Sequence, residues 1–199
     1  MHYDFVEIGT SDFDTEIQRC REYDRGICIE PLLVYLNRLP SKQYVHKVLA
    51  AVSDADGWVD CYYIPEEIIA NYNLPWWLRG CNSIFKPHPT GCQILLNANL
   101  DLQTTIKTTK IPMYSIKSLF EMFQVTSINF LKIDTEGHDC TILHSYLDWL
   151  TNSNLKANQI VFESNSLISS ESVDAIIAKL ENVGYELLHR GEDTYLRYR

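Results

Sequence analysis

Carboxylate and small polar residues lie at the ends of five apolar segments in this sequence. They are Glu7 with Gly9, Glu30, Ser53 with Asp54, Asp134, and Glu163. Any one of them alone is typical of a helix cap or a solvated turn. Five at corresponding positions favour a ligand site, because oxygen-rich side chains bind hydroxyl groups, accept protons and coordinate hard cations.

Glu30 follows Gly9 at a spacing that is informative by itself. About 20 residues separate the first glycine of a nucleotide-binding loop from an acid that accepts hydrogen bonds from a ribose. Two ribose hydroxyls meeting one carboxylate form charge-assisted hydrogen bonds, which a neutral residue could not match. The spacing therefore predicts an adenosine cofactor, and it fits NAD and S-adenosylmethionine equally well.

Lys132 lies inside an apolar segment, where a lysine without a partner would be costly to bury. If the first and fourth strands are neighbours, and if Gly9 and Asp134 mark their ends, Glu7 lies level with Lys132. We therefore predict an ion pair between Glu7 and Lys132 across the central strands, beneath the cofactor's amino-acid end. A purely structural role for the same pair is compatible with this reading.

The elements that position these residues are short buried strands alternating with helices. The expected strands are DFVEIG (4–9), GICIEP (26–31), VHKVLAAVS (45–53), INFLKID (128–134) and QIVFES (159–164). Helical spacing occurs in residues 15–23, 32–39, 114–123, 139–150 and 170–183, the last with Ser169 or Ser170 as its N-cap and Gly184 as its stop. The alternation predicts an α/β fold with a mostly parallel sheet and helices on both faces.

Three other segments add to this pattern. The final residues YELLHRGEDTYLRYR predict an antiparallel hairpin around Gly191–Asp193. An additional strand is expected at residues 57–64. Residues 75–91 have no clear period and are expected to form a substrate lid, because long irregular segments in compact domains are often functional.

Composition limits the class of protein. The 199 residues are 46% hydrophobic and 22% charged, and their formal net charge is −9. This composition excludes dominant disorder, and the acidic balance disfavours a nucleic-acid partner. We expect one domain over residues 1–199, no signal peptide and no membrane span. The six cysteines lack a CxxC pair, which indicates reduced thiols and a cytoplasmic location.

The chain resembles the FkbM-type branch of class I S-adenosylmethionine-dependent methyltransferases over roughly residues 4–165. The strongest match is FLKIDTEGHDCTIL (130–143), which is similar to the family's K-I-D-x-E-G-x-E segment followed by an apolar helix. The other similar segments, in the family's order, are FVEIGTSDFDT (5–15), GICIEP (26–31), KVLAAVSDADGWVDCYY (47–63), NSIFKPHP (82–89), IPMYSIKSLF (111–120) and QIVFESN (159–165).

The first cofactor motif departs from the family. Relatives commonly read D-x-G-A-N-x-G, whereas this chain has Phe13 at the position of the last glycine. A side chain there obstructs close backbone approach to a pyrophosphate. S-adenosylmethionine carries no pyrophosphate, so the departure counts more heavily against NAD.

The resemblance implies a Rossmann-like fold and O-methylation of a sugar or other small metabolite or glycan, with S-adenosylmethionine as the cofactor. It implies Asp134 as the first candidate for a base or for orienting the substrate, and His138 as the second. The cofactor would contact Glu7, Gly9, Thr10, Ser11, Asp12, Glu30, Pro31, Ser53, Asp54 and Asp134.

Substrate contacts are expected in the lid and at the fifth strand. The candidates are Trp76, Trp77, Arg79, Ser83, Lys86, His88 and Glu163. Aromatic rings can stack on a sugar face, while cationic groups can hold polar substituents. We expect no metal requirement; the alternative is an Mg²⁺ site made by Asp134, Glu163 and Asn165.

Two other functions remain open from the sequence. The altered first motif also fits a catalytically weak methyltransferase-like module that binds a small molecule or a partner. An NAD-dependent oxidoreductase is the third reading. The tryptophans at 76 and 77 could equally pack into the core or into a homodimer contact.

Overall fold

The computed structural model describes residues 1–153 and 155–199, and these form two compact units. The larger unit contains Met1–Gly57 and Met113–Arg199, and the smaller unit contains Trp58–Pro112. The segment 75–91 lies within the smaller unit. The expectation of a single methyltransferase-like domain over the whole chain stays a prediction.

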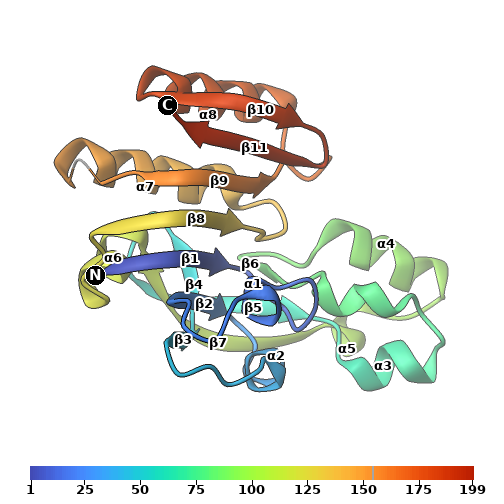
Figure 1. Cartoon of the computed structure of the whole chain (residues 1–199). Helices are drawn as coiled ribbons and strands as arrows, with labels where there is room; N and C mark the ends of the chain where they lie inside the picture. The colour runs from blue at the N-terminus through green and yellow to red at the C-terminus, as the bar shows by residue number, and fades with distance from the viewer. Residues whose placement is uncertain (154) are drawn as a thin grey trace. The chain divides into compact units, whose positions relative to one another are not determined.

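Among the described residues, the larger unit has a seven-stranded sheet in the order β10-β11-β9-β8-β1-β2-β3 (Figure 1). Neighbouring strands from β3 to β9 are parallel, whereas β11 is antiparallel to both β9 and β10. The strands are β1 (His2–Ile8), β2 (Gly26–Glu30), β3 (Val45–Leu49), β8 (Ser127–Ile133), β9 (Ala157–Glu163), β10 (Tyr185–Arg190) and β11 (Asp193–Tyr198). The predicted mostly parallel sheet with a C-terminal hairpin is confirmed.

Strand order reverses between β1 and β8. The chain runs outward from β1 through β2 to β3, and it then returns to β8 and continues to β9 on the other side. In open parallel sheets, ligands bind beyond the carboxyl ends of the strands at such a reversal. The ends of β1 and β8 are therefore the place where this fold provides a site.

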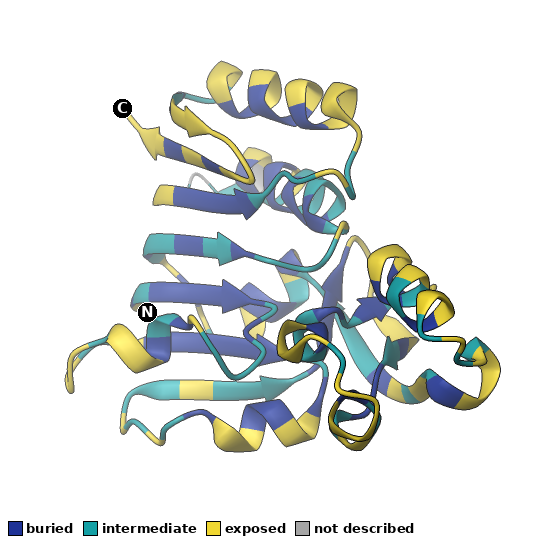
Figure 2. Ribbon diagram, turned by 90° about the vertical axis from the view of Figure 1, so that its right-hand side faces the viewer, coloured by how far each residue is buried: buried dark blue, intermediate teal, exposed yellow. Residues whose placement is uncertain are grey.

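Helices cover both faces of this sheet, as predicted. On one face, the side chains of β1 and β2 pack with α6 (Ile116–Met122), α7 (Asp139–Ser153) and α8 (Ser170–Asn182) in the main core. On the other face, α1 (Glu16–Arg19) and α2 (Leu33–Arg38) pack over a smaller cluster. Figure 2 shows the central strands as largely buried, and α8 as buried on one side only.

Side-chain alternation decides which face each β1 residue occupies. Val6 and Ile8 belong to the main core, whereas Phe5 packs with Ile17 of α1. Glu7 is two residues after Phe5, and it therefore points toward the α1 side. It is level with Lys132 in the β1–β8 register.

Helix signals in the sequence were reliable where capping residues were present. Ser169 caps α8, and its hydroxyl accepts a hydrogen bond from the Ser172 N–H. Gly184 follows the helix with φ of 104°, a conformation that suits glycine. The first helix is shorter than predicted: α1 ends at Arg19, and Cys20 is already extended.

Two expected elements differ in the structure. The predicted strand 45–53 is divided at Ala50 into β3, which pairs with β2, and β4 (Ala51–Ser53), which pairs with β7 (Lys107–Ser115). The helix expected at 114–123 begins only at Ile116, because Ser115 ends β7 and caps α6. Strand β7 was not predicted; it runs without a break through Pro112, which lacks a backbone N–H donor.

The smaller unit has its own apolar cluster, which includes Ile64, Leu78 and Leu95. Its elements are β5 (Gly57–Tyr63), α3 (Glu66–Asn71), the 3₁₀ helix η1 (Trp76–Gly80), β6 (Ser83–Ile84), α4 (Pro89–Asn97), α5 (Leu102–Thr105) and the first part of β7. The predicted strand at 57–64 is confirmed as β5, which pairs antiparallel with β6.

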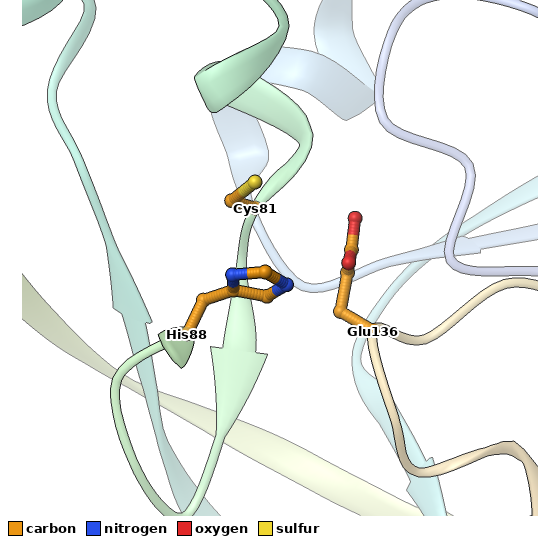
Figure 3. Close-up of side chains that lie close together, drawn as sticks. All are labelled: Cys81, His88 and Glu136. Atoms are coloured by element: carbon orange, nitrogen blue, oxygen red, sulfur yellow. The ribbon is translucent and has the colours of Figure 1, made fainter. Parts of the chain in front are cut away.

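Cys81 and His88 both line a small pocket in the smaller unit, together with Cys92. Figure 3 shows the first two side chains; Glu136, drawn with them, belongs to the larger unit. All six cysteines are free thiols, as the sequence indicated. None of the helices in the described residues has the length and apolar character needed to cross a membrane.

Candidate functional site

The ends of β1 and β8 approach each other closely at Gly9. Its φ is 81°, and a Cβ atom added there would lie 1.8 Å from the Asp134 carbonyl oxygen. The Gly9 N–H donates to Ile29 O, and the Asp134 N–H donates to Ile8 O, both at 2.9 Å. Only glycine fits this position, and it brings the ends of three central strands to one edge.

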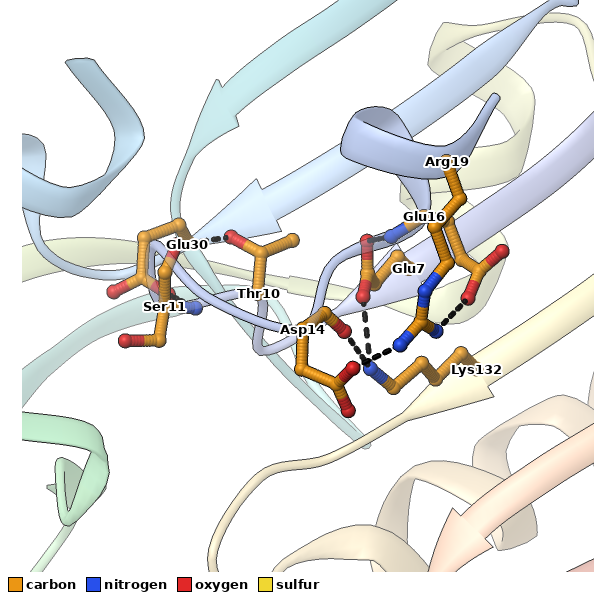
Figure 4. A network of polar contacts seen from close by, with 8 residues as sticks. All are labelled: Glu7, Thr10, Ser11, Asp14, Glu16, Arg19, Glu30 and Lys132. Carbon is orange, nitrogen blue, oxygen red and sulfur yellow. Dashed lines mark hydrogen bonds and ion pairs between the residues drawn. The ribbon is translucent and has the colours of Figure 1, made fainter. Parts of the chain in front are cut away.

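Glu30 is the anchor of the segment that follows Gly9. Its Oε2 accepts a hydrogen bond from the Ser11 N–H at 2.7 Å, and its Oε1 accepts one from the Leu32 N–H at 2.9 Å. The Thr10 hydroxyl donates to the same carboxylate (Figure 4). The Glu30 side chain is 2% exposed, and this burial raises its pKa to about 7, although the two backbone donors favour the charged form.

The predicted ion pair between Glu7 and Lys132 is confirmed. The Lys132 ammonium lies 3.0 Å from Glu7 Oε1, on the α1 side of the sheet (Figure 4). Glu7 is fully buried, and burial raises its pKa to about 7 against the opposing effect of Lys132. Glu7 is therefore enclosed beneath the loop.

Asp12 and Pro31 lie at the border of the same edge. Asp12 forms an ion pair with Arg38 of α2 at 3.0 Å, so its carboxylate is held by the protein itself. Pro31 is half-buried directly after β2. The Glu30 carboxylate itself is bound by Thr10, Ser11 and Leu32.

Ser53 and His138 meet near the end of β4. The Ser53 hydroxyl is buried and lies 2.9 Å from His138 Nε2, and it also donates to the exposed Asp54 carboxylate at 3.1 Å. Burial lowers the pKa of His138, while the negative charge of Asp54 opposes the shift. The imidazole is therefore mainly neutral at pH 7, which is the form that accepts a proton.

Three carboxylates gather where β8 and β9 end. Oxygen atoms of Asp134, Glu136 and Glu163 all lie within 4.8 Å of one another, a spacing that could hold a cation. Burial raises the pKa of Asp134 to about 6, with Lys132 opposing the shift. Burial and the neighbouring carboxylates raise the pKa of Glu163 to about 9.

Asn165, the third ligand of the alternative Mg²⁺ site, lies beside this group. Its amide nitrogen donates to Glu163, and its oxygen accepts from the Leu167 N–H at 2.9 Å. Glu136, which the sequence analysis did not name as a ligand, comes close to the other two acids instead. Its φ of 55° and the following Gly137 form the turn that brings it there.

Asp139 is a buried acid near this edge that the sequence analysis did not single out. It begins α7, is 0% exposed, and receives a hydrogen bond from the Thr135 hydroxyl at 3.0 Å on one oxygen. Within the described residues its other oxygen has no hydrogen-bond partner. Burial and the charge of Asp134 raise its pKa to about 7. In the sequence, the available signal for Asp139 was its position as an acidic residue in the first turn of the helix.

The Asp139→Asn variant should be more stable than the wild type at pH 8 by about 2 kcal/mol, seen as a higher melting temperature. A raised carboxyl pKa means that the folded state binds more protons, so stability is lost as pH rises from about 4 to about 7. Asparagine keeps an oxygen for Thr135 and cannot ionise. Thermal unfolding at pH 5 and pH 8 checks this, and an equal gain at both values would contradict it.

The predicted substrate residues occupy different environments within the smaller unit. Trp76, Trp77 and Lys86 are exposed, and the Arg79 guanidinium lies 5.3 Å from the centre of the Trp76 ring. The other two, Ser83 and His88, are buried. The Nδ1 atom of His88 accepts a hydrogen bond from the Gly91 N–H, so this side chain caps α4.

Comparison with known families gives one match. The family model described as the methyltransferase FkbM domain matches residues 7–187. The matched range includes the end of β1 from Glu7, the edge formed by Gly9 and Asp134, and both Glu30 and Glu163. Neither curated proteins nor solved structures contain a significant match to the chain.

Proposed function

The chain belongs to the FkbM methyltransferase family, and we propose that it transfers a methyl group from S-adenosylmethionine to a hydroxyl of a sugar, another small metabolite or a glycan. The observation that carries the proposal is the edge where β1, β2 and β8 end. There a buried carboxylate from Glu30, the close approach at Gly9 and the carboxylate of Asp134 occur together.

The hydrogen-bonding groups at this edge fit an adenosine-containing cofactor. Each carboxylate oxygen of Glu30 uses only part of its acceptor capacity on the loop and on Leu32, so it can also accept from ribose hydroxyls. The remaining expected contacts are Gly9, Thr10, Ser11, Asp12, Pro31, Ser53, Asp54 and Asp134. Glu7, the other residue expected from the sequence, is fully buried beneath the loop and bonds to Lys132 and to the Glu16 N–H, so we assign it to supporting the loop. When bound, S-adenosylmethionine supplies an electrophilic methyl group on a sulfonium.

The protein must align the acceptor oxygen and assist the loss of its proton. Asp134 is our first candidate for this role, since its raised pKa makes it a better base than an exposed aspartate. His138 is the second candidate, because burial keeps the imidazole neutral. Glu163 has a pKa of about 9 and is protonated at neutral pH, so it would donate a hydrogen bond to the acceptor.

We assign acceptor recognition to aromatic and cationic residues of the smaller unit, of which Trp76, Trp77 and Lys86 are exposed and Arg79 is half-buried. Trp76 and Trp77 would stack on a sugar face, and Arg79 and Lys86 would bind polar substituents. Ser83 and His88 are buried, and they would support the segment 75–91, which carries these substrate-binding side chains. The acceptor is a small molecule or glycan, and a nucleic acid is disfavoured by the net charge of −9.

Two further expectations belong to this proposal. We place the enzyme in the cytoplasm, which the six free cysteines support. A homodimer is the assembly that exposed aromatic residues such as Trp76 would favour. The working mechanism does not require a metal; Asp134, Glu136 and Glu163 are the group that would hold Mg²⁺ if activity depends on it.

Calorimetric titration of the full chain with S-adenosylhomocysteine, S-adenosylmethionine and NAD tests the cofactor. We expect saturable binding of both sulfur compounds and no binding of NAD. No response to the sulfur compounds would refute the proposal. Transfer of a labelled methyl group to a panel of sugars and glycans then tests turnover, and binding without turnover would favour the catalytically weak module.

A further inference from the structure

The loop between β1 and α1 keeps its shape although it has Phe13 in place of the last glycine of the family motif. Gly9 and two non-glycine residues, Ser11 and Asp14, have positive φ values of 81°, 49° and 57°. Such conformations are unfavourable for side-chain-bearing residues unless the surroundings hold them. Something in the structure must therefore stabilise this loop.

Lys132 supplies a contact at the far end of the loop. Its ammonium donates to the Asp14 carbonyl oxygen at 2.9 Å while it pairs with Glu7 Oε1 at 3.0 Å. The second oxygen of Glu7 accepts from the Glu16 N–H at 2.9 Å, where α1 begins. One buried ion pair therefore holds the backbone on both sides of Thr15 (Figure 4).

The ion pair between Glu7 and Lys132 lies where water weakens it little. Glu7 is fully buried and the Lys132 side chain is only 15% exposed, so water screens the pair weakly. Both charges are further satisfied by backbone groups, which is the condition under which a buried ion pair is favourable. At the near end of the loop, Glu30 holds the Ser11 N–H independently.

We propose that Lys132, acting through Glu7 and the Asp14 carbonyl, is a positioning residue that pre-shapes the cofactor loop, which lacks the last glycine of the family motif. The inference rests on the proposed function, because the loop is where the cofactor would bind. A loop already ordered before binding costs less conformational entropy when the ligand arrives. Lys132 thus acts through the loop backbone without contacting the reacting atoms.

The test needs a variant that does not leave a buried charge alone. Lys132→Met by itself would strand the Glu7 carboxylate and could prevent folding. The double variant Glu7→Gln/Lys132→Met removes both charges, and the glutamine oxygen can still accept from the Glu16 N–H. It therefore mainly removes the tie to Asp14. The single variant Lys132→Arg keeps a cation that can bind both the Glu7 carboxylate and the Asp14 carbonyl oxygen.

Hydrogen exchange without ligand is the first measurement. In the wild type we expect the Glu16 amide to be protected, and in the double variant we expect exchange at residues 10–16 to rise about 10-fold while core strands change little. Lys132→Arg should retain most of the wild-type protection of the loop amides. An unprotected Glu16 amide in the wild type, or unchanged loop exchange in the double variant, would overturn the proposal.

Affinity for S-adenosylhomocysteine is the second measurement. We expect the double variant to bind about 10-fold more weakly, which is 1.4 kcal/mol, with Lys132→Arg close to wild type. Unchanged affinity in a folded double variant would refute the positioning role. If the wild type itself does not bind, the cofactor assignment fails, while the exchange experiment still judges the loop contact by itself.

Discussion

Replacement of Glu30 by alanine should weaken binding of S-adenosylhomocysteine about 100-fold, which is 2.7 kcal/mol. The carboxylate holds the Ser11 and Leu32 amides and is our assigned acceptor for the ribose hydroxyls. Alanine removes all of these acceptors and leaves buried donors without partners, a loss that exceeds one ordinary hydrogen bond. Calorimetric titration measures the affinity, and circular dichroism verifies the fold.

Glu30→Gln separates charge from shape at this position. Glutamine keeps one carbonyl acceptor and nearly the same volume, so the loop should survive while ribose binding loses its charge assistance. We expect an affinity between those of wild type and Glu30→Ala. Glu186 is a half-buried acid on β10, and Glu186→Gln is the matched control that should bind normally. Normal affinity in Glu30→Ala would remove this residue from the cofactor site.

Strand and acid positions in the larger unit could be predicted because their causes are local in sequence. Apolar segments that end in Glu30 and Asp134 became β2 and β8, and the hairpin followed from the turn at Gly191. The Glu7–Lys132 pair was also predictable, since burial of a lysine demands a nearby acid. Parallel neighbours with matching ends placed the two residues level.

Other features depend on contacts that are distant in sequence. Nothing local divides β3 from β4 at Ala50; the division exists because β4 pairs with β7, more than 50 residues later. The Asp14 carbonyl is a backbone group that every residue type carries, so its hydrogen bond to Lys132 could not be predicted from the residue at position 14. Ser53 was assigned to the cofactor, but its contact with His138 joins segments 85 positions apart.

The carboxylate group at the edge shows the same limit. Asp134 and Glu163 were predictable as strand ends, whereas Glu136 joins them only through the positive φ of the turn that contains it. Asp139 reads as an ordinary first-turn acid, and only the packing around α7 makes it fully buried. Such packing raises the pKa of several carboxyl groups together, which a linear pattern does not express.

Asp134→Asn should lower kcat about 100-fold and leave the affinity for S-adenosylhomocysteine within about 3-fold of wild type. The close contact with Gly9 is made by the Asp134 backbone carbonyl, so asparagine preserves it. The amide cannot accept the acceptor's proton, and the loss therefore falls on turnover. Single-turnover kinetics and calorimetric titration of the same preparation measure the two quantities separately.

The pH dependence gives the same assignment a second test. Because burial raises the pKa of Asp134 to about 6, wild-type kcat should rise with pH as this carboxyl ionises, with a midpoint near 6. The Asp134→Asn profile should lack that step. His138→Gln is the companion variant: if histidine is the base, the larger loss moves to this variant. A fall in cofactor affinity for Asp134→Asn as large as for Glu30→Ala would contradict the division of roles, because both acids would then belong to cofactor binding.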